Sequence, residues 1–347
     1  MRLLIVEDFT SGALPRDTPG WNSLTAEGTA MLLAMTQDAV AIPIGRVEVF
    51  WSEHLDDFPV SKTHVHRIGT PNEEARRFAE IAGQVDRVLV IAPESGGRLQ
   101  HRRNEVDAVG GQFIGGSADA LSLCADKLQL AAHLQKAGLP IIPTQCVTIR
   151  DDPPSPPTSS GWVVKPRDGA GSVLTFHVRD ADAWRRAVEE ITQAGFEAIH
   201  QPYIPGVSLS MAGIISQSGI EIFPLATQEI ADHQGTLSYE GGTLGPLPAN
   251  SPREQSIAQA AAQLVRETLA SIPGLVGYVG VDLILPHDFA TPIVVEVNPR
   301  LTTSYLGYRQ LARQNLAPRI LDPEGFHPPI KWHPDRVIRF GPTAPEW

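Results

Sequence analysis

The sequence predicts a mixed α/β and α+β protein, in which a parallel α/β unit is followed by two α+β units. From the start to about residue 116, apolar runs typical of buried strands, such as residues 3–6 and 87–93, alternate with helix-patterned segments. This alternation is typical of a doubly wound parallel sheet. At 347 residues the chain is also too long for one average domain. We therefore expect units at residues 1–116, 117–204 and 205–347.

The composition is that of an ordinary globular protein, with 42% hydrophobic and 19% charged residues. A net charge of −11 argues against nucleic acid or an anionic membrane as the main partner. Only Cys124 and Cys146 are cysteines, so a reducing cytoplasm fits better than a disulfide framework. No apolar stretch reaches the length of a membrane span, and the first residues predict a strand rather than a signal peptide. We expect a cytoplasmic protein that acts on small molecules, with a homodimer as the commonest kind of assembly.

The first unit carries two clear helix patterns, one at residues 25–39 and one opened by Thr70, Pro71 and Glu73, which form a capping box. Ligands of doubly wound sheets lie beyond the carboxyl ends of the strands. Residues 7–12 and 94–103 should therefore face a cleft.

Charged side chains in these two segments can orient a charged small molecule: Glu7, Glu94, Arg98, His101, Arg102 and Arg103. For any one of them, a solvated polar loop is an equally good interpretation. His64 and His66 alternate along a strand without further ligand-spaced partners, so we interpret them as ordinary strand residues rather than a metal site.

The second unit opens with a helix-rich stretch that contains Lys127 directly after Asp126. A helical lysine is, by itself, typically a solvated surface charge. A strand at residues 143–149 follows, and then residues 151–160 form a proline-rich segment that we expect to be a surface loop.

A short strand at residues 162–164 then leads to Lys165 and to a glycine-rich loop, residues 168–172. Glycines let backbone N–H groups approach an anion, and such a loop can close over phosphates. The loop is not a P-loop, because no GK[ST] ends it, and no helix follows directly as in the dinucleotide fingerprint. Taken alone, the segment is more typical of a glycine hairpin near a lysine.

The third unit contains a helix capped by Ser251 and Glu254 and then an acidic hairpin. The apolar residues of its first strand share one face: Val279, Val281, Leu283 and Leu285. Those of its second strand do the same: Ile293, Val295 and Val297. If the hairpin is symmetric about Phe289, Asp282 lies opposite Glu296 on the other face, beside Asn298.

Opposed Cβ atoms on paired strands lie about 4.5–5.5 Å apart, which is unfavourable for like charges, so a cation should sit between Asp282 and Glu296. Truncating Glu296 should accordingly relieve repulsion. Two carboxylates and an amide oxygen suit Mg²⁺ that also holds substrate phosphates. The alternative is a pair of solvated acids on an exposed sheet face.

The order of these features over about residues 117–305 resembles the ATP-grasp superfamily: a helical Asp-Lys, a strand lysine before a glycine-rich loop, Gln-Pro-Tyr-Ile at 201–204, and an acid on one strand with Glu-Val-Asn-Pro-Arg on the next. The resemblance implies that ATP binds with Mg²⁺, or alternatively Mn²⁺, between two α+β lobes. The preceding α/β domain would help to hold substrate.

The resemblance also implies residue roles. Lys127, Lys165 and the loop residues Gly169, Gly171 and Ser172 would contact the phosphates. Gln201, Tyr203 and Ile204 would form the hinge that faces adenine, largely through backbone groups. Asp282, Glu296 and Asn298 would hold the metal ions, while Arg300 and Lys165 would stabilise charge on the transferred phosphoryl group.

Three positions depart from the superfamily pattern. Gln201 stands where Glu is frequent, Ser208 stands where a ribose-binding carboxylate is common, and Gly280 stands where some ligases carry an arginine. These departures concern ribose contacts and transition-state donors and leave the metal set intact.

Within the superfamily, the segments VEDFTSG, IAPESGGRL and NPRLTTSYLGYR are similar to the tyramine–L-glutamate ligase group, which acts in methanofuran synthesis. That similarity implies a γ-glutamyl phosphate attacked by the amine of tyramine. Apart from the resemblance, an amine must lose a proton to attack, and a carboxylate near the cleft such as Glu7 or Glu94 can accept it. Thr302, Thr303 and Ser304 would bind the acyl phosphate or the substrate carboxylate, or else satisfy their own turn.

Two other interpretations remain at this stage. The chain can be an ATP-grasp ligase for a different carboxylate and amine, or a nucleotide-binding regulatory protein without catalysis. An NAD-dependent oxidoreductase is disfavoured, because no G-x-G-x-x-G follows the first strand.

Overall fold

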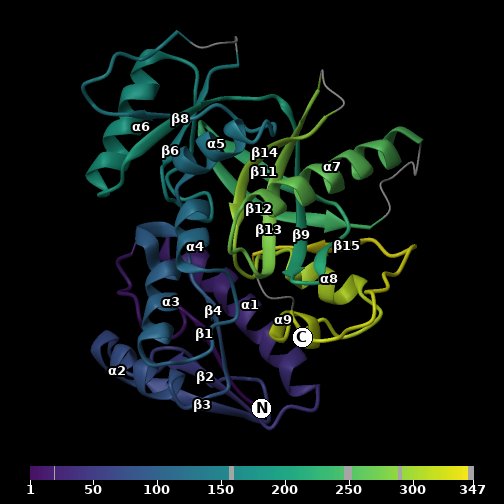
Figure 1. The fold of residues 1–347 in the computed structure, drawn as a ribbon. Helices are drawn as coiled ribbons and strands as arrows, with labels where there is room; N and C mark the ends of the chain where they lie inside the picture. The colour runs from purple at the N-terminus through teal and green to yellow at the C-terminus, as the bar shows by residue number, and fades with distance from the viewer. Residues whose placement is uncertain (19, 156–159, 246–251, 288–290, 343–347) are drawn as a thin grey trace.

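The computed structural model describes residues 1–18, 20–155, 160–245, 252–287 and 291–342. Within these residues the strands form a four-stranded sheet and an eleven-stranded sheet. The smaller sheet lies at the base of the molecule in Figure 1, and the larger one spans the two lobes above it. No helix in the described part of the chain is both long and apolar enough to cross a bilayer.

The smaller sheet is parallel throughout and has the order β3-β2-β1-β4. Its strands are β1 (Arg2–Glu7), β2 (Arg46–Ser52), β3 (Thr63–Ile68) and β4 (Arg87–Ile91). The helices around it are α1 (Trp21–Val40), α2 (Pro71–Ala82) and α3 (Arg98–Ala108). Leu3 and Ile5 share a core cluster with α1, whereas Leu4 and Val6 share another with α2 and α3. Alternate residues of β1 thus pack against helices on opposite faces of the sheet. This confirms the predicted α/β fold of the unit.

Local caps explain where several helices begin. The Thr70 side chain accepts a hydrogen bond from the Glu73 N–H at the start of α2, and the Glu73 carboxylate accepts one from the Gly69 N–H. This is the predicted capping box, with one difference. The Glu73 carboxylate accepts from the N–H of Gly69, the residue before the N-cap, rather than from Thr70 itself. Some residues on which sequence expectations fall lie outside the described residues: Ser251, Phe289 and residues 156–159.

The larger sheet is antiparallel and has the order β14-β13-β9-β11-β12-β7-β6-β8-β5, with β10 on β9 and β15 on β12. Its first strands are β5 (Gln145–Val147), β6 (Trp162–Pro166), β7 (Phe176–Val178) and β8 (Ala198–Pro202). The later strands are β9 (Gly206–Ser216), β10 (Gly219–Ile222), β11 (Ala226–His233), β12 (Thr236–Leu244), β13 (Gly277–Pro286), β14 (Ile293–Asn298) and β15 (Ile338–Phe340). The link between the lobes is the pair Thr236 and Phe176, where β12 meets β7.

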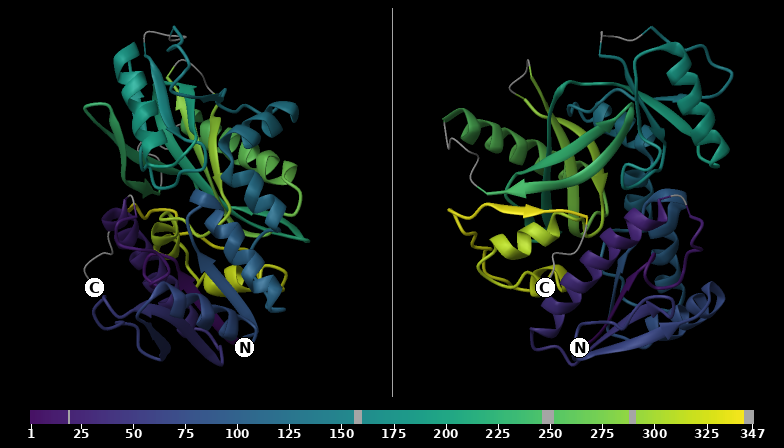
Figure 2. Two further views of the ribbon diagram at one scale, coloured as in Figure 1. Left: turned by 90° about the vertical axis from the view of Figure 1, so that its left-hand side faces the viewer. Right: turned by 180° about the vertical axis from the view of Figure 1, so that it is seen from behind.

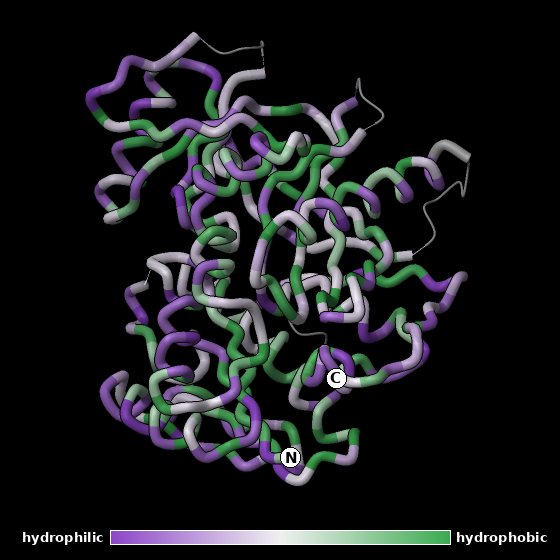
Figure 3. Tube along the Cα trace, in the orientation of Figure 1, coloured by the Kyte–Doolittle hydropathy of each residue, from purple (hydrophilic) through white to green (hydrophobic). Residues whose placement is uncertain are grey.

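Helices cover this sheet and connect it to the base. They are α4 (Ala118–Ala125), α5 (Lys127–Lys136), α6 (Ala181–Gln193), α7 (Pro252–Ser271), α8 (Tyr305–Leu311) and α9 (Ala317–Leu321), with a 3₁₀ turn at η1 (Ser95–Gly97). The hydropathy colouring shows apolar runs along the central strands (Figure 3).

The C-terminal helices bind the third unit to the first. In the views of Figures 1 and 2, α8 and α9 lie beside α1, and one buried cluster runs from Leu3 and Ile5 to Leu306 and Ile320. The Arg309 guanidinium also pairs with the Asp38 carboxylate at 2.7 Å. The N-terminal unit is therefore fixed against the C-terminal lobe by a shared core.

The acidic hairpin contains an irregularity that the sequence did not predict. Asp282 pairs with Glu296 as expected, but Leu283 pairs with Val294. The bulge turns Val294 into the core, where it is fully buried, and leaves Val295 on the cavity side. The expectation that Val295 shares a face with Val297 is therefore wrong.

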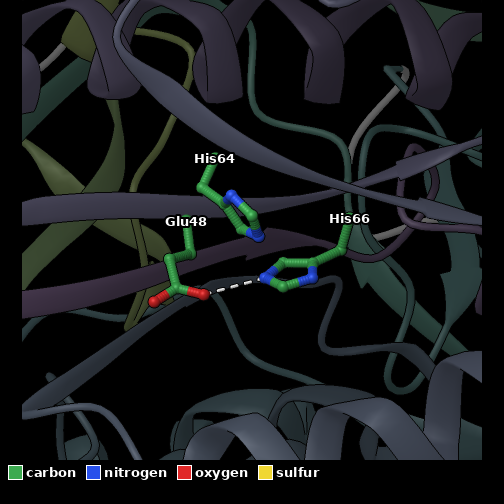
Figure 4. A group of neighbouring side chains, drawn as sticks. All are labelled: Glu48, His64 and His66. Atoms are coloured by element: carbon green, nitrogen blue, oxygen red, sulfur yellow. Dashed lines mark hydrogen bonds and ion pairs between the residues drawn. The ribbon is translucent and has the colours of Figure 1, made fainter.

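A hydrogen-bonded network joins the first three strands. Figure 4 shows Glu48 beside His64 and His66, and the His66 Nε2 lies 2.8 Å from a Glu48 carboxylate oxygen. One ligand atom from each of the three residues lies within 4.8 Å of the others. However, the Nδ1 of His66 faces an Arg77 guanidinium nitrogen at 3.2 Å. A guanidinium can only donate, whereas a metal-bound histidine donates from its second nitrogen, so the geometry favours a hydrogen-bonded network over a metal site.

Because of this network, the free energy of unfolding should decrease as the pH falls. Burial lowers the pKa of His66 below its ordinary 6.5. Burial alone would raise the pKa of Glu48, but the bonds from His66 and Arg2 outweigh it and hold that pKa below 4.5. The folded state thus binds fewer protons than the unfolded chain. The His66 contribution to stability is present above pH 6.5 and is lost as the pH falls through its lowered pKa, whereas that of Glu48 is lost only below pH 4.5.

We predict that His66→Gln flattens the fall in unfolding free energy between about pH 7 and pH 5, measured by urea denaturation at each pH. His54→Gln, at an exposed histidine outside the network, is the matched control for loss of a histidine. Parallel curves for the wild type and His66→Gln would contradict the assignment.

Candidate active site

A cavity of about 340 Å³ lies where the three units meet. Its wall includes most residues singled out from the sequence: Glu7, Lys127, Lys165, Gly169, Gly171, Ser172, Gln201, Tyr203, Ile204, Ser208, Asp282, Glu296, Asn298, Arg300, Thr302, Thr303 and Ser304. The structure thus brings together side chains that are up to about three hundred residues apart in the chain. Glu94 and Arg98 lie outside this wall.

The opposed acids of the hairpin lie on the C-terminal side of the cavity. The Asp282 carboxylate accepts hydrogen bonds from the Asn298 amide at 3.0 Å and from the Gln228 amide at 2.9 Å. Burial and the neighbouring Glu296 carboxylate raise the pKa of Asp282. Beside a charged Glu296, the ionised form of Asp282 is therefore disfavoured unless a cation is present.

Two buried lysines from the other lobe face these acids. Lys127 and Lys165 are each 7% exposed, and the Lys127 ammonium lies 3.7 Å from a Glu296 oxygen. Burial alone would raise the pKa of Glu296, but Lys127 and Lys165 outweigh it and hold that pKa below its ordinary value. Burial lowers the pKa of Lys165 to about 8, although the Glu296 charge opposes this. The cavity therefore contains an acid pair and a lysine pair from opposite lobes.

This arrangement changes one expectation from the sequence. Truncation of Glu296 was expected to relieve repulsion with Asp282. In the structure it also removes the nearest counter-charge of two buried ammonium groups, Lys127 and Lys165. Because an uncompensated buried charge is costly, the truncation should destabilise the protein.

The acid pair is chemically suited to a divalent cation. Asp282, Glu296 and Asn298 offer hard oxygen donors from two neighbouring strands, which is the donor set that Mg²⁺ accepts alongside phosphate oxygens. A cation here would also relieve the like-charge contact that raises the pKa of Asp282. The residues present therefore fit a magnesium ion.

The glycine loop, residues 168–172, packs against the N-terminal unit. Gly171 has a φ of +63°, and a Cβ at this position would lie 2.6 Å from a Leu24 methyl carbon of α1. The Asp168 carboxylate accepts a hydrogen bond from the Gly96 N–H at 2.8 Å. The Lys127 ammonium donates to the Gly169 carbonyl at 2.5 Å. The loop therefore lies over the cavity in contact with both the lysine pair and α1.

The hinge segment follows β8. The Tyr203 N–H donates to the Gly161 carbonyl at 3.0 Å, and its ring stacks on His177 with centroids 3.7 Å apart. The Gln201 amide donates to the Thr144 hydroxyl at 2.8 Å. Asp232, which the sequence did not single out, also lines the cavity and accepts from the His177 ring at 2.9 Å.

Arg300 is held by a residue that lies outside the wall. Its guanidinium donates twice to the Glu94 carboxylate, at 2.9 and 3.0 Å. Such a bidentate pair fixes the direction of the guanidinium. Glu94 is thus brought to the site through Arg300 rather than by facing the cavity.

The arginines of α3 do not face the cavity. Arg98 and Arg102 both bind the fully buried Asp8 carboxylate, at 2.7 and 2.8 Å. His101 and Arg103 bind acids on their own helix. Their place after β4 predicts that these four side chains face the cleft, but they pair with acids of the N-terminal unit outside the cavity wall.

The turn after Asn298 satisfies part of its own bonding. The hydroxyl groups of Thr302 and Ser304 lie 2.8 Å apart, and both contact the Tyr278 hydroxyl, at 3.1 and 3.4 Å. The Thr303 hydroxyl instead donates to the Glu27 carboxylate of α1. All three residues also line the cavity, so their proposed role in binding the acyl phosphate or the substrate carboxylate stays a prediction.

Sequence reasoning also missed several polar cavity residues, among them Glu27 on α1, Gln228 and Asp232 on β11, and Tyr239 on β12. None belongs to a local motif. Their partners lie far away in the chain, as in the bond between Glu27 and Thr303. No signal in the sequence alone could have selected them.

Comparison with protein-family models identifies the family. A model described as ATP-grasp domain matches residues 124–304, which is more than half of the chain. The chain belongs to the ATP-grasp family. A second model, described as pre ATP-grasp 3 domain, matches residues 46–121 in the N-terminal unit.

Two curated relatives of this ATP-grasp protein are ligases. A D-alanine–D-alanine ligase of Gluconobacter oxydans is 28% identical over 204 residues, which cover 57% of this chain and 64% of the relative. The match thus spans less than two thirds of that relative's length. A tyramine–L-glutamate ligase of Methanocaldococcus jannaschii is 23% identical over 267 residues, covering 76% of this chain and 72% of the relative.

Solved structures agree on the ATP-grasp fold. A putative ATP-grasp superfamily protein from Archaeoglobus fulgidus gives a TM-score of 0.67 at 18% identity, covering 98% of this chain and 99% of that one. An L-amino acid ligase from Bacillus licheniformis gives 0.65 at 17% identity, covering 92% and 73%. The predicted fold of two α+β lobes with a preceding α/β domain is confirmed.

We predict that Asp282→Asn weakens Mg²⁺-dependent nucleotide binding by at least about tenfold, because it removes one negative oxygen donor from the cation site. The measurement is the rise in melting temperature caused by ADP with Mg²⁺, compared with ADP and EDTA. The exposed Asp57→Asn variant is the matched control. An equal Mg²⁺-dependent shift in Asp282→Asn would contradict the assignment.

Proposed function

We propose that the chain is an ATP- and Mg²⁺-dependent ligase that activates a carboxylate as an acyl phosphate and joins it to an amine. The observation that carries the proposal is the juxtaposition, in one cavity, of the Asp282–Glu296 acid pair and the Lys127–Lys165 lysine pair from the opposite lobe. The ligase activity of the curated relatives supports it.

The chemistry requires activation because an ionised carboxylate resists attack by an amine. Transfer of a phosphoryl group to the carboxylate supplies a leaving group, and this transfer depends mainly on positioning and charge neutralisation. Lys127 and Lys165 approach the cavity from one lobe and Arg300 from the other, so they can stabilise the phosphate charge from two sides.

Magnesium, or alternatively manganese, held by Asp282, Glu296 and Asn298 would neutralise the nucleotide phosphates. The glycine loop shields the acyl phosphate from water through its contacts with α1 and Lys127. The hinge residues Gln201, Tyr203 and Ile204 face the base and Ser208 faces the ribose in this proposal.

For the substrates we propose L-glutamate and tyramine, in a reaction of methanofuran synthesis. The support is the similarity to the Methanocaldococcus jannaschii tyramine–L-glutamate ligase, which extends over 76% of this chain. The similarity to a D-alanine–D-alanine ligase favours a second candidate, an amino acid as the acceptor. A screen of carboxylates and amines separates the two.

The proposal further assigns residues 1–116 to substrate binding and residues 117–204 and 205–347 to the nucleotide-binding lobes. It places the reaction in the cytoplasm and includes a homodimer as an option for the assembly.

We predict that the protein with ATP, Mg²⁺, L-glutamate and tyramine forms ADP, phosphate and γ-glutamyltyramine, detected by mass. Formation of ADP with another pair but not this one would favour the second candidate. Tight ATP binding without ADP formation under any pair would favour a regulatory protein without catalysis.

Lys165→Ala should abolish product formation, because it removes a positive charge from the phosphate side of the cavity while the fold, judged by circular dichroism, is retained. The exposed Lys136→Ala on α5 is the matched control. Turnover of Lys165→Ala close to that of the wild type would show that the site is assigned wrongly.

A further inference from the structure

Two consecutive acids at the end of β1 have opposite surroundings. Strand alternation directs Asp8 toward Arg98 and Arg102, which both pair with its carboxylate. Glu7 points the other way, into the wall of the cavity, and is 2% exposed. Within the described residues Glu7 forms no ion pair.

The Glu7 carboxylate keeps acceptor capacity free for a ligand. It accepts from the backbone N–H groups of Phe9 at 3.2 Å and Thr10 at 2.8 Å, and the Thr10 side chain also bonds to it. A carboxylate has about four acceptor sites, so at least one remains for a ligand in the cavity. A buried carboxylate without a cation is costly, and a fold retains one most readily where a ligand supplies the charge.

The neighbouring helix is shaped around this carboxylate. A Cβ at Gly28 of α1 would lie 2.3 Å from the Glu7 carboxyl carbon. Glycine is unfavourable inside a helix, by roughly 1 kcal/mol relative to alanine, so its presence here needs a reason. The reason we see is that only glycine leaves room for the Glu7 carboxylate at the cavity wall.

Glu7 is also connected to the reacting end of the cavity. The residue before Gly28 is Glu27, whose carboxylate accepts from the Thr303 hydroxyl. Thr303 lies three residues after Arg300 on the turn that follows the metal strand. The acids of the N-terminal unit and the proposed acyl phosphate site therefore share one stretch of wall.

The charges and apolar surfaces of this end suit an amine. Among the described residues the basic side chains of the wall are Lys127, Lys165 and Arg300, and the first two lie by Glu296 while Arg300 is paired with Glu94. The wall near Glu7 and Glu27 adds apolar side chains: Phe9, Leu24 and Met31. An ammonium group on an apolar body complements this composition.

We propose that Glu7 binds the ammonium group of the acceptor amine and takes its proton, with Gly28 as the residue that gives the carboxylate room. This inference rests on the proposed ligase function. The ammonium gives one proton to the Glu7 carboxylate, and the freed nitrogen lone pair forms the C–N bond. The C–O bond to phosphate breaks, phosphate leaves with that electron pair, and it takes the second proton lost from nitrogen.

The protonation of Glu7 agrees with this role. Burial raises the pKa of Glu7 to about 8, opposed by the hydrogen bonds from Phe9 and Thr10. The adjacent Asp8 charge raises the pKa of Glu7 further although its side chain points the other way, and Glu27 on α1 is the other acid on this stretch of cavity wall. A carboxylate with this pKa becomes able to accept a proton as the pH rises through about 8, which is near the operating range of a general base.

The test separates the two halves of the reaction with hydroxylamine. Hydroxylamine is small and largely unprotonated at neutral pH, so it traps an acyl phosphate as a hydroxamate without a protein base. The wild type and Glu7→Gln are assayed with ATP, Mg²⁺ and L-glutamate, once with hydroxylamine and once with tyramine, or with the pair that the substrate screen identifies.

We expect Glu7→Gln to lose about 100-fold or more in kcat/KM for the amine, while hydroxamate formation is largely retained. The rise of amide formation with pH through about 8 should disappear in the variant. Equal loss of both products, or an unchanged pH profile, would overturn the inference. Absence of hydroxamate in the wild type with every carboxylate would instead overturn the proposed function.

Gly28→Ala provides a second variant that keeps the carboxylate but displaces it, since the atoms a Cβ would meet are the flexible end of Glu7. It should keep the native fold, judged by circular dichroism, with a modest loss of stability because the bonds to Glu7 are disturbed, and show the same selective loss of amine turnover. Glu105→Gln, an acid of the same unit outside the cavity wall, is the matched control. Full amine turnover in Gly28→Ala would also contradict the inference.

Discussion

The structure depends on the contact between two partly buried acids and two buried lysines from opposite lobes. Asp282 and Glu296 face each other on neighbouring strands, and Lys127 and Lys165 approach them from the other lobe. Neither pair is favourable alone, because the acids repel and the ammonium groups are desolvated. Together they offset one another, and they leave a site that a cation and a triphosphate can complete.

The rest of the fold holds these four groups at that spacing. The β11–β12 hairpin reaches β7 and makes one sheet of both lobes, while α8 and α9 share a core with α1. The core that α8 and α9 share with α1 brings the end of β1 to the cavity. The N-terminal unit thereby supplies Glu7 and Glu27 to a site whose nucleotide chemistry belongs to the other two units.

The sequence predicted the parts of the site that follow local rules. The period-two alternation of β-strands and the symmetry of a short hairpin were enough to place Asp282 opposite Glu296. The bulge at Val295 was not predictable, because alternate registers expose equally apolar valines. The place of Arg98 after β4 predicts that it faces the cleft, yet its guanidinium pairs with the buried Asp8 carboxylate outside the cavity wall. Glu27 escaped notice since its role depends on a contact with Thr303, 276 positions away.

The most direct measurement of the central claim is a crystal structure with Mg²⁺ and a non-hydrolysable ATP analogue. The account predicts a metal ion about 2.1 Å from oxygens of Asp282 and Glu296, with the Lys127 and Lys165 ammonium groups on the phosphates. A nucleotide bound elsewhere, or lysines directed away from its phosphates, would contradict it.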